Sequence, residues 1–255
     1  MVVPPVVKAA VDVGDRAVVQ AWLDRCDPGA VNDRCAEGYT CIHRSMNLYG
    51  PIQPQHVDLA RFLISRGADV NLCGLDNWAP LHLACFWTGS AEMVSLLLQA
   101  GAGSVLETRT TDPGQSVYPD STPLGILLHS FRDRDIEDED DMSNFQESLV
   151  ALLRAGASLC SNDEDKSAIN IMRGHLVNDR TLADDDDYIK CREILAGVRE
   201  HGSYKRYARA PHREFLRFRS LLVRGRAKTN ELHERIARLP NGACWKVLSY
   251  WREDN

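Results

Sequence analysis

Apolar residues recur along most of the chain in short helical groups, each of which is followed by glycine. The group Val94-Ser-Leu-Leu-Leu98 leads to Ala100-Gly-Ala102, and the earlier group Leu59-Ala-Arg-Phe-Leu-Ile64 leads to Arg66-Gly-Ala68. Glycine at this place is typical of a helix C-terminus, because it adopts the left-handed cap conformation without strain. The two glycines lie about 34 residues apart, a spacing that predicts a repeated unit of two helices and a turn.

Aligning the helical groups, the turns and the glycines traces this unit five times. The repeats lie near residues 8–34, 38–71, 77–108, 121–160 and 166–200. The first repeat lacks the usual opening sequence and the fifth is degenerate, and end repeats that cap a stack are normally atypical. We therefore expect residues 1–202 to form one repeat domain, in which neighbouring repeats bury the apolar faces that a single repeat leaves exposed.

Three repeats open with a similar sequence before their first helix. These openings are Gly38-Tyr-Thr-Cys-Ile-His43, Asn77-Trp-Ala-Pro-Leu-His-Leu-Ala84 and Ser121-Thr-Pro-Leu-Gly125. Thr40 and Thr122 are placed to cap the free N–H groups of the helix that follows. Pro80 and Pro123 suit the first helical position, where no hydrogen bond is lost.

The units resemble ankyrin repeats, whose signature is T-P-L-H-x-A, a V-x-x-L-L helix and then G-A-D-V-N. The resemblance implies an all-α ankyrin-repeat solenoid of helix-turn-helix repeats with a C-terminal helical segment. It also implies a concave strip of turns and inner helices that binds a protein partner. His43 and His82 occupy the signature histidine, and we expect them to hydrogen-bond between adjacent turns rather than to act in catalysis.

Large side chains gather at the expected turn tips and inner helices of repeats two to four. Aromatic residues are over-represented at binding hot spots, and a large ring at Trp78 stands where small polar residues are common in the family. We therefore expect the partner-binding residues to be Tyr39, Leu75, Asp76, Trp78, Phe86, Trp87 and Tyr118. The alternative is that rings such as Phe86 and Trp87 only fill the space between stacked helices.

No catalytic or cofactor-binding signature occurs in the sequence. The phosphate-binding, dinucleotide-binding, nucleophile-elbow and metalloprotease motifs are all absent. The eight cysteines have no C-x-x-C pair, which disfavours a zinc site and favours free thiols in a reducing compartment. The acidic stretches 132–141 and 184–187 lack the layout of a calcium loop, and we expect them to be solvated loops. We expect no enzyme activity, no cofactor and no metal.

The chain has neither a secretory signal nor an apolar run of the ~20 residues that cross a bilayer. We therefore expect a cytoplasmic protein without a membrane partner, with the nucleus as the alternative location.

Charge is divided unevenly along the chain. The net charge is −6, but Ser203–Arg238 has eleven Lys and Arg against three Glu and carries +8. Leu239–Asn255 has two residues of each sign, so residues 1–202 carry −14. The basic tail could contact phosphates, but pairing with the acidic body explains its charge more simply. We therefore expect no nucleic acid partner.

Residues 203–255 predict three further helices, beginning near Pro211, Thr229 and Ala243. The tail resembles a SOCS box, which follows ankyrin repeats in a family of ubiquitin-ligase substrate receptors and binds elongin, although the expected cysteine is missing. Leu239-Pro240 with Val247-Leu-Ser-Tyr250 is also similar to the opening of an F-box. Either resemblance implies an adaptor-binding tail that uses Leu216, Leu221, Leu239, Pro240, Trp245 and Leu248. The alternative is a helical cap that closes the solenoid, so an interaction scaffold and a ligase receptor both stay open.

Overall fold

The computed structural model describes residues 2–48, 50–86, 90–111, 118, 120–131, 139–160 and 167–224. The chain divides into two compact units, residues 1–196 and 197–255. The described residues are mostly helical and contain no strand, apart from one isolated bridge between Arg34 and Thr40. The expected all-α class is therefore confirmed.

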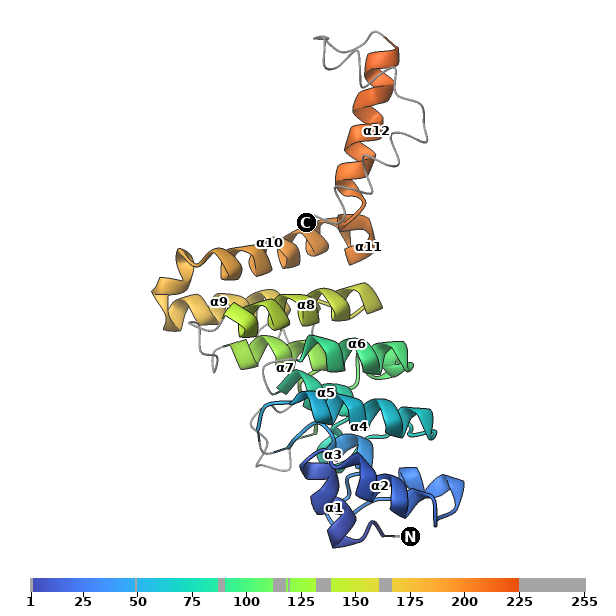
Figure 1. Cartoon of the computed structure of the whole chain (residues 1–255). Coiled ribbons are helices and arrows are strands. Elements are labelled where there is room, and N and C mark those ends of the chain that lie inside the picture. The colour runs from blue at the N-terminus through green and yellow to red at the C-terminus, as the bar shows by residue number, and fades with distance from the viewer. Residues whose placement is uncertain are drawn as a thin grey trace. The chain divides into compact units, whose positions relative to one another are not determined.

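The first unit is a stack of helix pairs (Figure 1). Its helices are α1 (Pro5–Asp12), α2 (Arg16–Leu23), α3 (Cys41–Arg44), α4 (Pro54–Ser65), α5 (Pro80–Phe86), α6 (Ala91–Gln99), α7 (Pro123–Ser130), α8 (Glu139–Ala155), α9 (Ala168–Asn178) and α10 (Asp186–His201), which runs on into the second unit. Short 3-10 turns lie between them: η1 (Pro28–Asn32), η2 (Leu75–Asn77), η3 (Ala102–Val105) and η6 (Arg180–Ala183).

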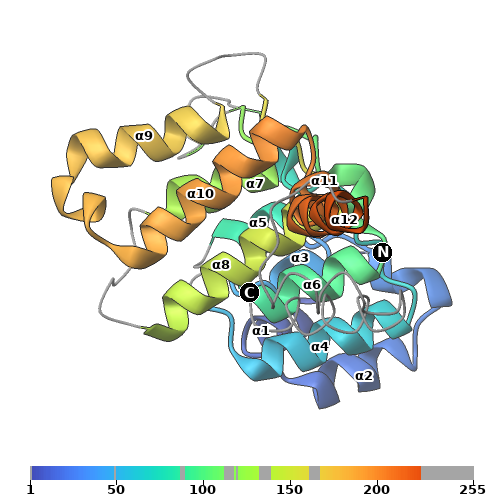
Figure 2. The same ribbon diagram turned by 90° about the horizontal axis from the view of Figure 1, so that it is seen from above.

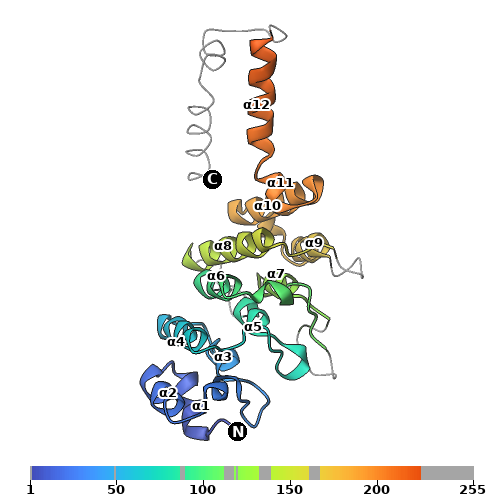
Figure 3. The same cartoon turned by 90° about the vertical axis from the view of Figure 1, so that its right-hand side faces the viewer.

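In successive helix pairs, each inner helix packs on the next inner helix and each outer helix on the next outer helix. The inner helices contact one another in the order α1, α3, α5, α7 and α9, and the outer helices in the order α2, α4, α6 and α8. Seen from above, α5, α7 and α9 lie along one side of the stack and α4, α6 and α8 along the other (Figure 2). The side view shows the same two rows (Figure 3). This arrangement is the solenoid that the repeat pattern predicts.

The helix ends follow the local sequence signals. The Thr122 hydroxyl accepts a hydrogen bond from the backbone N–H of Gly125 at 3.2 Å, and α5 and α7 begin at Pro80 and Pro123. Gly67 and Gly101, the two glycines of the 34-residue spacing, have φ of 88° and 100°. Both are the left-handed positions that the pattern predicts, because only glycine adopts them at no cost.

The apolar faces of the outer helices form the core of the stack. On α6, Val94 and Leu97 have no exposed surface and Leu96 is only 9% exposed. This helix packs between α4 and α8, so each repeat buries the face that its neighbour presents. Burial of this kind supplies the stability that a two-helix unit lacks by itself.

The first repeat is joined to the second by a buried arginine that the sequence did not single out. The Arg44 side chain on α3 is 2% exposed. Its Nε and a terminal nitrogen donate to the two carboxylate oxygens of Asp12 on α1, at 2.7 and 2.6 Å, and its other terminal nitrogen donates to Glu37 at 2.6 Å. Lys8 on α1 also pairs with Glu37, so four charges tie the end repeat to its neighbour.

Part of the acidic sequence expected to form loops is helical instead. Helix α8 begins at Glu139 and α10 at Asp186. The Asp185 carboxylate caps α10 by accepting from the backbone N–H of Tyr188 at 2.6 Å, and Asp187 pairs with Lys190 at 2.9 Å. Acidic residues stabilise a helix N-terminus, where free N–H groups carry partial positive charge, so the prediction of solvated loops was wrong for these residues.

The second unit contains the short helix α11 (Tyr204–Tyr207) and α12 (Ala210–Val223). The Tyr207 ring packs against Gly197 and against the rings of His201 and Tyr204. Helix α12 is the helix predicted near Pro211, and on it Leu216 is half-buried and Leu221 is 37% exposed. The other two predicted tail helices lie outside the described residues, as do Leu239, Pro240, Trp245 and Leu248.

Candidate protein-binding surface

Two of the repeats present a tight turn, here called a finger, before the inner helix, at residues 33–40 and 72–79. In the finger 72–79, the backbone N–H of Gly74 donates to the carbonyl of Trp78 at 2.7 Å. Asp76 and Asn77 between them have φ of 52° and 62°, the left-handed region that Asp and Asn tolerate best after glycine. The turn therefore holds Asp76 at its tip in a defined position.

Successive fingers are bonded to one another. The Arg34 guanidinium in the finger 33–40 donates to the carbonyl of Cys73 at 2.8 Å. The Asn77 amide donates to the carbonyl of Arg109 at 2.6 Å, and the backbone N–H of Thr111 donates to the carbonyl of Asp76 at 2.8 Å. Hydrogen bonds thus join the two fingers to each other and the second finger to residues 109–111.

Close packing of side chains on glycine joins the first two fingers. The Tyr39 ring lies so near Gly74 that a Cβ there would come within 2.6 Å of it. In return Leu75, which is 50% exposed, covers Gly38. Tyr39 and Leu75 therefore lie across the boundary between two repeats.

The signature histidines lie behind the fingers and link adjacent turns, as predicted. In His82, Nδ1 accepts from the backbone N–H of Ala79 at 3.0 Å and Nε2 lies 3.0 Å from the carbonyl of Thr108. His43 bonds in the same way to Thr40 and, at 3.2 Å, to the carbonyl of Trp78. Burial lowers the pKa of both imidazoles to about 4, so both are neutral at pH 7 and serve the fold.

Four rings from two successive repeats form a continuous row on the finger side. The Trp78 and Phe86 rings meet edge to face with centroids 5.7 Å apart, and Phe86 meets Tyr118 at the same distance. Tyr118 stacks on His129 with centroids 5.4 Å apart and planes 18° apart. All four side chains are half-buried. Each residue of this aromatic row, Trp78, Phe86, Tyr118 and His129, thus retains some exposed surface.

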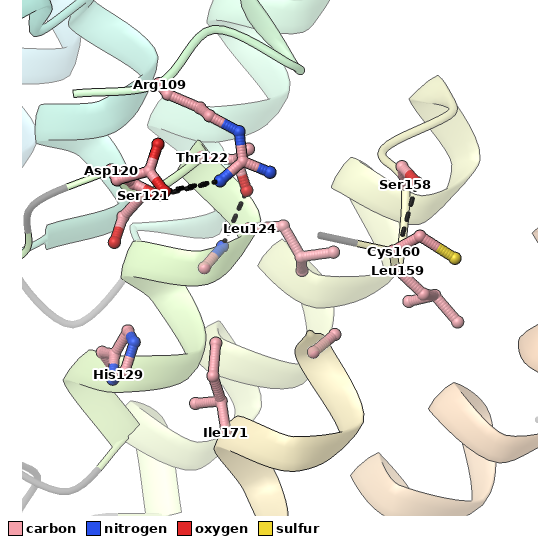
Figure 4. A pocket seen from close by; sticks show the side chains of 12 residues that line it. Arg109, Asp120, Ser121, Thr122, Leu124, His129, Ser158, Leu159, Cys160 and Ile171 are labelled. Carbon is pink, nitrogen blue, oxygen red and sulfur yellow. Dashed lines mark hydrogen bonds and ion pairs between the residues drawn. The ribbon is translucent and has the colours of Figure 1, made fainter. Parts of the chain in front are cut away.

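A shallow hollow continues the surface beyond His129 (Figure 4). It measures about 340 Å³ with its solvent-facing space included and lies between the fingers and inner helices of the fourth and fifth repeats. Its lining includes Arg109, Asp120, His129, Ser158, Cys160 and Ile171. Arg109 pairs with Asp120 at 3.5 Å on one wall, opposite Ser158 and Cys160. A small hollow lined by both polar and apolar residues suits contact with a partner's side chain.

Residues 7–108 match the family model of ankyrin repeats, in three copies. The match includes the first repeat, the fingers that contain Tyr39 and Trp78, and helices α3 to α6. Beyond the matched residues, α7, α8 and α9 continue the same pattern of helix contacts. The expected all-α ankyrin-repeat solenoid is therefore confirmed. No curated protein matched the sequence significantly.

Ankyrin repeats are generally protein-interaction modules. Three of the expected partner-binding residues, Trp78, Phe86 and Tyr118, lie together in the aromatic row. Tyr39, Leu75 and Asp76 lie on the two ankyrin fingers beside it. Trp87 falls outside the described residues. The role of all seven in binding stays a prediction.

Sequence reasoning missed His129, although a repeat signal for it exists. Phe86 is the seventh residue of α5, counted from Pro80, and His129 is the seventh residue of α7, counted from Pro123. The two therefore occupy equivalent ankyrin positions. The hollow was missed as well, because Arg109 and Ser158 are separated by a whole repeat and only the stack brings them together.

In the described repeats and the described part of the tail, no group of three or more His, Cys, Asp or Glu side chains is placed to hold a metal ion. No disulfide joins the described cysteines. None of the described helices has both the length and the apolar character that membrane crossing requires.

Proposed function

We propose that the chain is a non-catalytic protein-interaction scaffold whose concave face, made of fingers and inner helices, binds a partner at the aromatic row. The observation that carries the proposal is the contact of four half-buried rings across two repeats. Aromatic rings supply large contact area with few rotatable bonds, which lowers the entropy cost of binding. Fingers bonded to one another hold these rings in place before a partner arrives, which favours affinity.

Replacing Phe86 and Tyr118 together with glutamine is expected to weaken partner binding at least about tenfold, because rings at the centre of an interface are common hot spots. Both side chains are half-buried, so a circular dichroism spectrum should report a folded stack. The measurement is quantitative mass spectrometry of proteins captured from lysate, followed by a titration with the partner that is enriched most.

The matched control is Leu98→Gln on α6, which replaces another half-buried apolar side chain, but on an outer helix. It should retain the captured partners. Equal capture by the double variant and the original chain, with both folded, would show that the concave aromatic row does not bind the partner.

A second candidate function is the substrate receptor of a cullin-type ubiquitin ligase, with the repeats holding a target and the tail an adaptor. It is favoured by helix α12, which exposes Leu221 to 37% within the second unit. An exposed leucine on a helix is a suitable contact for an adaptor groove. The departure at Ser220, where a SOCS box has cysteine, stands against it.

Leu221→Asp is expected to remove any elongin or cullin adaptor captured by the full chain, because a charge in an apolar groove loses its hydration. The side chain is already exposed in part, so the melting temperature should hardly change. A chain ending at Gly202 should lose the same adaptors and keep the proteins bound by the repeats. Absence of adaptors from the full-chain capture would exclude the receptor function.

A further inference from the structure

The carboxylate of Asp76 stands apart from the other acids of the finger surface. Glu37 is paired with Arg44 and Lys8, and Asp120 with Arg109. Asp76 is exposed, and within the described part of the chain its side chain has no hydrogen bond and no ion pair. Its left-handed backbone at the tip of a bonded finger fixes where the charge lies. A charge fixed in this way is available to a partner without further ordering.

Aromatic residues belong to the same two fingers as this carboxylate. The Tyr39 ring packs on Gly74, two residues before Asp76. Burial raises the pKa of the Tyr39 hydroxyl, and the negative charge of Asp76 raises it further. Trp78 follows two residues later in the same finger and is the first ring of the aromatic row. The finger therefore carries an exposed negative charge and, two residues later, a half-buried Trp78 ring.

The chemistry of this fingertip selects among possible partner segments. Rings alone would suit a proline-rich segment, and a carboxylate alone would suit any cation. A guanidinium matches both, since it is flat, weakly hydrated, stacks on aromatic faces and donates to carboxylates in pairs. The charge of −14 on residues 1–202 would also speed the approach of a basic segment.

We propose that the partner's binding segment is extended and basic, and that one of its arginine side chains lies over the Trp78 ring with its guanidinium on the Asp76 carboxylate. This proposal rests on the proposed function and names the chemistry of the segment that the concave face binds. The remaining rings of the row, Phe86 and Tyr118, contact apolar parts of the same segment.

The test uses the full chain and short fluorescein-labelled peptides in which glycine alternates with arginine, lysine or proline. Fluorescence anisotropy gives the dissociation constant for each peptide. The arginine peptide is expected to bind several-fold more tightly than the lysine peptide, because the guanidinium stacks on the ring as well as pairing with the carboxylate. The proline peptide is expected to bind most weakly, since it carries no charge.

Two variants of equal net charge locate the contact. Asp76→Asn removes the charge and keeps a residue that tolerates a left-handed backbone. Glu92→Gln removes one charge from outer helix α6, where Glu92 pairs with Arg61 at the surface. Asp76→Asn is expected to weaken arginine-peptide binding about fivefold, and Glu92→Gln less than twofold.

Equal effects of the two variants would overturn the proposal, because the peptide would then respond only to net charge. A proline peptide that binds as tightly as the arginine peptide would overturn it as well. If the arginine peptide fails to bind while capture of the cellular partner still depends on Phe86 and Tyr118, the basic-segment proposal is wrong and the proposed function stands. If neither dependence is seen, both are wrong.

Discussion

Replacing Arg44 with alanine is expected to lower the free energy of unfolding by about 3 kcal/mol. The guanidinium is 2% exposed and makes charged hydrogen bonds to Asp12 and Glu37. Alanine would leave Asp12, 22% exposed, without its partner and would open space inside the stack. Because Asp12 lies on α1, the end repeat should loosen first, and amide hydrogen exchange of α1 should quicken more than that of α6.

Arg61→Ala is the matched control, because it breaks an ion pair in which both side chains are more than half exposed. Such pairs contribute less than about 1 kcal/mol, so the urea midpoint should move little. Combining Arg44→Ala with Asp12→Ala should cost less than the two single changes added together, since no buried charge is left alone. A loss for Arg44→Ala no larger than for Arg61→Ala would contradict the structural role of the buried pair.

The folded chain is expected to lose about 3 kcal/mol of stability between pH 6.5 and pH 5, through His43 and His82. Burial lowers the pKa of each imidazole to about 4, against an ordinary value of 6.5. Below pH 6.5 the unfolded chain therefore binds two protons that the folded chain does not bind. Stability is complete above pH 6.5 and falls as the pH drops toward 4. Urea titrations at several pH values measure this loss.

The histidines and the carboxylates are expected to affect stability in different ranges of pH. Hydrogen bonds lower the pKa of Asp179 and of Asp187, so stability that depends on these groups is lost only as the pH falls below about 4. His82→Asn offers a control, because the asparagine oxygen can accept from the backbone N–H of Ala79 in place of Nδ1. Its slope between pH 6.5 and pH 5 should be half that of the original chain. A flat profile in the original chain would show that neither histidine is held neutral by the fold.

Arg44, His43 and His82 stabilise the repeats that carry the binding surface. The His43 and His82 side chains bond to the carbonyls of Trp78 and Thr108, so they hold the fingers against the inner helices. The aromatic row and Asp76 stand on the same fingers. We therefore expect protonation of the histidines to weaken binding at the concave face over the same range of pH in which it weakens the fold.

Local patterns in the sequence determined the repeat, its helices and its caps. The spacing of Gly67 and Gly101, the prolines at the starts of α5 and α7, and the apolar face of α6 each depend on residues close in the chain. Helix periodicity and capping act over a few residues, so a sequence states them directly. The alignment of repeats also located Trp78, Phe86 and Tyr118, because equivalent positions in a stack face the same way.

Only the tertiary structure decided which side chains meet between repeats. Arginine side chains are mostly exposed in folded proteins. Arg44 is buried because its guanidinium pairs with Asp12, which lies 32 residues earlier in the chain. The contact of Tyr118 with His129 and the hollow beside it depend on how one finger lies over the next inner helix. The first turn of α10 likewise involves a residue distant in the chain, because the Gln146 amide on α8 donates to the Asp187 carboxylate. Such contacts depend on the offset between neighbouring repeats, which no short stretch of sequence contains.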